Sequence, residues 1–91
     1  MNRAEILKKA DEIIHGIRED MYGGPENNFT VIAKMWSFYL GMPINAADVA
    51  AMMILLKVAR IGSGQVLIDN WIDIAGYAAC GGEIQTWKEE E

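Results

Sequence analysis

The side chains best suited to chemistry gather in residues 48–80. They are two cations in an apolar segment and, beyond a glycine-bearing connection, two carboxylates, an amide and a phenol: Lys57, Arg60, Asp69, Asn70, Asp73 and Tyr77. Residues three, four or seven apart share one face of a helix, so the cations form one group and the later residues another. Cations hold phosphate or carboxylate groups directly, whereas hard oxygen ligands also suit magnesium.

Two helices must position these groups. The sequence predicts helices over about 46–61 and 69–85, joined by a turn at residues 62–64. A short connection makes two helices antiparallel neighbours. We therefore expect Lys57 or Arg60 to lie within about 4 Å of Asp69 or Asp73, which is salt-bridge distance.

Two further helices complete the predicted fold. Apolar periodicity predicts one over about 2–20, with Asn2 and Glu5 as a capping box, and another over about 28–40, capped by Asn27 or Asn28. Trp36 belongs to an aromatic stripe of this helix, and stripes at this spacing usually pack in a core or interface. The expected architecture is a single all-α domain of four helices over residues 1–91, with a loose acidic tail at 86–91.

The helix predicted over 46–61 is apolar on nearly every side, with only Asp48, Lys57 and Arg60 polar. Such a helix is expected to be buried, either at the centre of the domain or between subunits. In a chain of 91 residues, three other helices cannot easily cover it. The sequence therefore predicts a homo-oligomer with the second or third helix at the interface.

Composition narrows the functional classes. The net charge of −5 argues against nucleic acid as a partner, because phosphate backbones require a basic footprint. The single Cys80 excludes an internal disulfide and a four-cysteine zinc site. Residues 1–9 have no apolar signal core, and the longest apolar run, Val49–Leu56, is short for a membrane span. We expect a cytoplasmic protein, with no catalytic nucleophile–base pair and no metal site.

The polar group itself has two interpretations. In the first interpretation it is a ligand site, because titratable groups in an apolar cleft are candidates for function. Alternatively it is a buried ion-pair network, which would be only weak evidence for stability. A ligand site would leave the cations facing an open cleft, whereas a packing network would close the same residues on one another.

Three segments carry a resemblance to a family of small bacteriophage and prophage proteins of unknown function. They read YGGPENNFTVIAKMW, DVAAMMILLKVAR and DNWIDIAGYAACGGEI, and the resemblance covers about residues 15–85. It implies a phage origin, and hence the cytoplasm of a bacterial host, without implying an activity.

The same region is more distantly similar to all-α nucleoside triphosphate pyrophosphohydrolases of the MazG type. That family holds magnesium with E-x-x-E on one helix and E-x-x-D on the next. Asp73 matches the final acid, Asn70 replaces a carboxylate, and residues 54–57 contain no acid where E-x-x-E would stand. The resemblance implies the fold and a nucleotide-sized cleft. Lys57 and Arg60 would replace the metal-mediated phosphate site with a direct cationic one.

These observations favour binding of a nucleotide or nucleotide-like molecule without turnover and without a cofactor, as in sequestration of a host defence signal. Lys57 and Arg60 would hold phosphate, Asn70 and Asp73 base or ribose, and Tyr77 or Trp36 would stack. One alternative is a divergent magnesium-dependent pyrophosphohydrolase with Asp48, Asp69 and Asp73 as metal ligands. Another is a structural or protein-interaction module.

Overall fold

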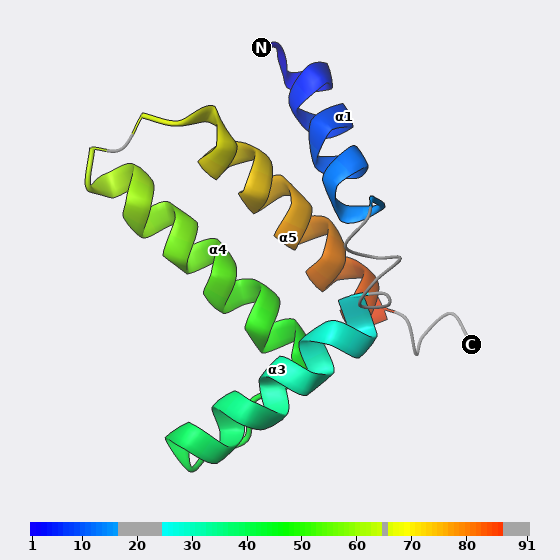
Figure 1. Ribbon diagram of the computed structural model, residues 1–91, viewed down its shortest axis with the longest axis vertical. Helices are drawn as coiled ribbons and strands as arrows, with labels where there is room; N and C mark the ends of the chain where they lie inside the picture. The colour runs from blue at the N-terminus through cyan, green and yellow to red at the C-terminus, as the bar shows by residue number, and fades with distance from the viewer. Residues whose placement is uncertain (17–24, 65, 87–91) are drawn as a thin grey trace.

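Four α-helices make up the part of the chain that the computed structural model describes, residues 1–16, 25–64 and 66–86. They are α1 (Arg3–Ile14), α3 (Pro25–Leu40), α4 (Ala46–Gly62) and α5 (Ile68–Thr86) (Figure 1). The described residues contain no strand, which confirms the all-α prediction. Most of the predicted tail lies outside the described residues.

The hairpin of α4 and α5 is the most closely packed pair, and the two helices run antiparallel (Figure 1). Gly81 lets them approach, because a Cβ built on this residue would lie 3.0 Å from the Cβ of Ala50. A capping box at Asn45 and Asp48 starts α4: each side chain accepts the other residue's backbone N–H, at 2.8 and 3.0 Å. The predicted antiparallel hairpin is confirmed.

Helix α1 lies along α5, and its Ile14 Cγ2 would lie 3.1 Å from a Cβ on Gly76. The predicted capping box of Asn2 and Glu5 is present. The helix ends at Ile14 with His15 as its C-cap, short of the predicted end at residue 20; residues 17–20 lie outside the described part of the chain. Apolar periodicity continues beyond that point, but Gly16 is a poor helix former.

Helix α3 begins at Pro25 rather than at residue 28, so Asn27 and Asn28 lie in its first turn and do not cap it. Proline suits the first helical position, because the N–H that it lacks would have no partner within the helix there. At the other end, the Ser37 hydroxyl donates to Ala33 O at 2.7 Å and accepts from Ile44 N at 2.8 Å. This serine ties the connection between α3 and α4 to α3 itself.

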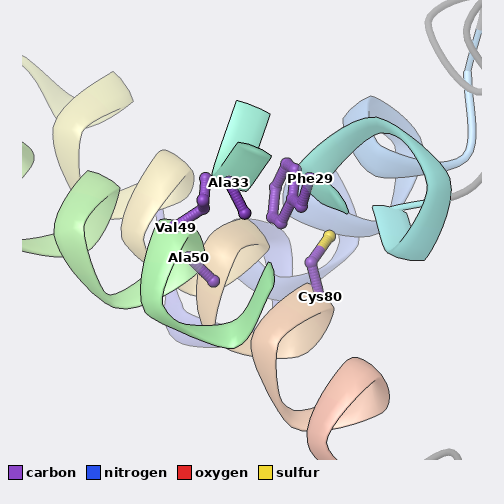
Figure 2. Close-up of a cluster of buried hydrophobic side chains, with 5 residues drawn as sticks. All are labelled: Phe29, Ala33, Val49, Ala50 and Cys80. Atoms are coloured by element: carbon purple, nitrogen blue, oxygen red, sulfur yellow. The ribbon is translucent and has the colours of Figure 1, made fainter. Parts of the chain in front are cut away.

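The buried cluster lies where α3, α4 and α5 meet. It consists of Phe29, Ala33, Val49, Ala50 and Cys80 (Figure 2). Of the larger described side chains, only Val49 is fully buried. The C-terminal half of α3 extends beyond this cluster (Figure 1), and its Phe38 and Tyr39 are exposed.

Helix α4 is not buried at the centre of the chain, which is one of the two places that its apolar sequence predicts. Only Val49 and Ala50 are buried, whereas Leu55 and Val58 are 65% and 50% exposed. The reason is that α3 and α5 cover one side of α4, and no described helix covers the other. Despite this apolar character, no helix in the described residues has the length and hydropathy to cross a membrane.

Candidate functional site

A pocket of about 280 Å³ lies among all four described helices. Its walls are mainly apolar and include Ile14 of α1, Ile32 of α3, Met53 of α4 and Ile72 of α5. Four side chains with polar groups also line it: Asn28, Asp73, Tyr77 and Cys80. An apolar concavity with a few polar groups is the usual form of a small-molecule site.

The polar side of the pocket is built by α5. Asp73 and Tyr77 are four residues apart and therefore lie on the same helix face. The Tyr77 ring packs against Phe29 of α3, with ring centroids 6.1 Å apart and an interplanar angle of 35°. A carboxylate and two aromatic rings thus border one space.

An ion pair joins the pocket to the hairpin. Lys57 Nζ of α4 lies 3.1 Å from Asp73 Oδ2, and the two side chains are 13% and 31% exposed. This confirms the prediction that a cation of the third helix reaches an acid of the fourth. The two charges pair with one another, as the interpretation of an ion-pair network requires. Asp73 nevertheless also lines the pocket.

The remaining predicted site residues are dispersed. Asn70 is 2% exposed, and Trp36 packs against the buried cluster. Arg60 and Asp69 are exposed, and neither they nor Asn70 and Trp36 line the pocket. Arg60 belongs to the last turn of α4 and Asp69 to the first turn of α5. At those positions both charges complement the helix dipoles, which explains them without a ligand.

The magnesium ligands considered for a pyrophosphohydrolase do not come together. Asp48 belongs to the first turn of α4, whereas Asp73 pairs with Lys57. Asp48 and Lys57 are nine positions apart on α4, a rise of about 14 Å. The ligand set Asp48, Asp69 and Asp73 is therefore wrong. Within the described ranges, no three His, Cys, Asp or Glu side chains are placed to share a metal ion.

Of the residues that line the pocket, only Asp73 and Tyr77 belong to the predicted site, and three of the others carry polar or aromatic groups. Phe29 and Asn28 come from α3, and Cys80 follows Tyr77 by three residues on α5. Helical spacing already placed Cys80 on the face of Tyr77, so that residue was accessible to sequence reasoning. The α3 residues could not be inferred in this way, because helical periodicity does not show which helix an apolar stripe packs against.

Comparison with known proteins relates this chain to one protein family and to phage proteins. The family described as "Domain of unknown function (DUF6378)" matches residues 5–85. The Gene 55 protein of Mycobacterium phage D29 is 45% identical over 75 residues, covering 82% of this chain and 50% of that protein. The Gene 55 protein of Mycobacterium phage L5 is 42% identical over 86 residues, covering 93% and 55%. The chain thus spans about half the length of these relatives. No solved structure matches it.

Proposed function

This chain belongs to the DUF6378 family, which includes phage proteins, and on that premise we propose that it binds a nucleoside or nucleotide-like molecule without turning it over. Sequestering a signal molecule of the infected host is a role that such binding would serve. The observation that carries the proposal is the pocket bordered by Asp73, Tyr77 and Phe29.

The size of the pocket limits the ligand. Sites for drug-sized molecules occupy about 300–1,000 Å³, and this pocket, at about 280 Å³, lies just below that range. It suits a base or nucleoside rather than a dinucleotide. The largely apolar walls favour the base as the part that enters, with any phosphate left towards solvent.

Each polar group has a chemical role in this proposal. The Asp73 carboxylate accepts hydrogen bonds from amino or ring N–H groups of a base, or from ribose hydroxyls. The Tyr77 and Phe29 rings offer apolar faces for stacking. Lys57 already pairs with Asp73. A phosphate group of the ligand would bind the Lys57 ammonium group and thereby weaken this ion pair.

The binding experiment uses a matched pair of variants on α5. Asp73→Asn changes the pocket, whereas Asp69→Asn removes the same charge one turn earlier at an exposed position outside it. Wild type and Asp69→Asn are expected to show the same heat of binding in titration calorimetry with nucleosides and their monophosphates. Asp73→Asn should bind at least tenfold more weakly, since a hydrogen bond to a charged group contributes about 1.5–3 kcal/mol.

The phosphate contribution is measured in the same way on α4. Lys57→Ala should reduce the preference for a monophosphate over its nucleoside, whereas Arg60→Ala, three residues further at an exposed position, should leave it unchanged. Equal affinities for Asp69→Asn and Asp73→Asn, or no binding of any nucleoside or nucleotide at millimolar concentration, would contradict the proposal. Magnesium-dependent release of pyrophosphate, lost in Asp73→Asn, would establish the enzyme instead.

A further inference from the structure

The hairpin of α4 and α5 has a second side, which we call the outer face. It includes Ala51, Leu55 and Val58 of α4 and Trp71, Ala78 and Gly82 of α5. A helix turns about 100° per residue, so Ala51 and Leu55 lie opposite the pocket-lining Val49 and Met53. By the same geometry, Trp71 and Ala78 lie away from Ile72 and Cys80, which line the pocket.

No described part of the chain covers the outer face. Leu55 and Trp71 are 65% and 54% exposed. Gly82 lies inside α5, where glycine is less favourable than alanine, yet a Cβ built on it would meet no atom within 4 Å. Within the described residues, no contact requires a glycine at that position.

We propose that the outer face packs against the same face of a second copy of this chain, giving a bundle of four helices. The spacing supports this packing. Positions 51, 55 and 58 on α4, and 71, 75, 78 and 82 on α5, follow alternating steps of four and three. This is the repeat that lets helix pairs interdigitate in bundles. Small residues at Ala75, Ala78 and Gly82 leave space for the larger Leu55, Val58 and Trp71 of the partner.

Charge favours a second copy as the occupant. The chain carries a net charge of −5, so two copies repel one another unless the touching surfaces are free of acids. None of the outer-face residues named above is charged, and Asp69 and Asp73 project from other sides of the hairpin by the same helical geometry. Asp48, three residues before Ala51, lies at the N-terminal end of this row, where it belongs to the capping box with Asn45. A surface that is apolar and uncharged can meet itself across a two-fold axis without like-charge contacts.

The available area is at the lower limit for a specific dimer. A helix the length of α4 extends about 26 Å, and two adjacent helices are about 20 Å wide. The face therefore covers on the order of 500 Å² per copy, or on the order of 1,000 Å² for the pair, which is about the threshold for a specific interface.

The test is the mass of the full chain in solution, measured by light scattering at micromolar concentration. Wild type should have twice the chain mass of 10.1 kDa. Leu55→Glu and, independently, Ala78→Glu should give the single-chain mass with unchanged helical circular dichroism, because both positions are exposed within one copy. Leu7→Glu on α1 is the matched control, since Leu7 is 64% exposed and lies outside the outer face. It should remain a dimer.

Three results would overturn the proposal. A monomeric wild type would show that no second copy binds to the outer face. Dimers that persist in both Leu55→Glu and Ala78→Glu would place the contact elsewhere. A dimer dissociated by Phe38→Glu, but not by Leu55→Glu, would assign the contact to the exposed side of α3.

Discussion

At the scale of single residues, Asp73 connects the two interpretations of the polar group. Its carboxylate pairs with Lys57 and also lines the pocket. The Lys57 side chain is only 13% exposed, so its methylene groups pack in the hairpin. Its ammonium charge is balanced by the Asp73 carboxylate. A ligand that hydrogen-bonds to Asp73 would therefore compete with, or complete, an interaction that already contributes to packing.

The contribution of the ion pair to stability is measurable in a double-mutant cycle. We expect Lys57→Met and Asp73→Asn each to lower the free energy of unfolding by about 1–3 kcal/mol, less than the cost of stranding a fully buried charge. The reason is that Asp73 remains 31% exposed to solvent. The double variant should lose less than the sum of the two, with a coupling of about 1 kcal/mol. Urea unfolding gives all three values.

The controls for this cycle are the neighbouring charges that form no ion pair with another described residue. Arg60→Met and Asp69→Asn are exposed, so each should change the free energy of unfolding by no more than about 0.5 kcal/mol. A coupling near zero between Lys57 and Asp73 would mean that the pair does not persist in solution.

At the scale of the helices, glycines set the distances between helix axes. Gly81 faces Ala50 of α4 and Gly76 faces Ile14 of α1, and an added methyl group would lie only 3.0 and 3.1 Å from them, so the neighbour would have to shift by a few tenths of an ångström. Small residues in the segment 69–85 thus permit close helix approach at two contacts, those of Gly76 and Gly81. The adjacent Gly82 has open space around it and belongs to the outer face.

This difference between adjacent glycines gives a second stability prediction. Gly81→Ala should lower the free energy of unfolding by about 1–3 kcal/mol, the usual cost of overpacking, since α4 and α5 must separate to admit the new methyl group. Gly82→Ala should raise it by about 0.5–1 kcal/mol through helix propensity. Both are to be compared in the Leu55→Glu background, so that assembly does not enter the measurement.

Thermal or urea unfolding of this pair supplies the readout, with the Leu55→Glu chain as reference. An equally stable Gly81→Ala variant would show that the hairpin can relax at Ala50. A destabilised Gly82→Ala variant would contradict the open space around Gly82 in the single chain.

At the scale of the whole molecule, local signals predicted the helices and their hairpin well. Capping residues such as Asn2 and Asn45 and the turn glycines marked most boundaries. The start predicted at about residue 28 followed Asn27 and Asn28 as candidate caps, whereas α3 begins at Pro25, since proline suits the first helical position. The length predicted for the first helix followed apolar periodicity to residue 20, whereas α1 ends at Ile14; residues 17–20 lie outside the described part of the chain.

The candidate site was only partly predictable. Residues on one hairpin, such as Lys57 and Asp73, are brought together by local connectivity. Phe29 reaches the pocket through the crossing of α3 over the hairpin, which depends on tertiary packing that helical periodicity does not encode. Arg60 and Asp69 have the right chemistry but stand at helix ends, where dipole and solvent account for them.

The docking of α1 on α5 has a thermodynamic consequence for the pocket. Among the described helices, α1 packs closely against α5 alone, yet Ile14 forms part of the pocket wall. A ligand that needs this wall binds the docked state in preference to the undocked one, so binding and docking are linked equilibria. Saturating ligand should slow amide hydrogen exchange across α1 by the same factor as it stabilises docking, up to about a hundredfold at a hundred times Kd. Exchange in α1 that is unaffected by a bound ligand would show that the wall is dispensable.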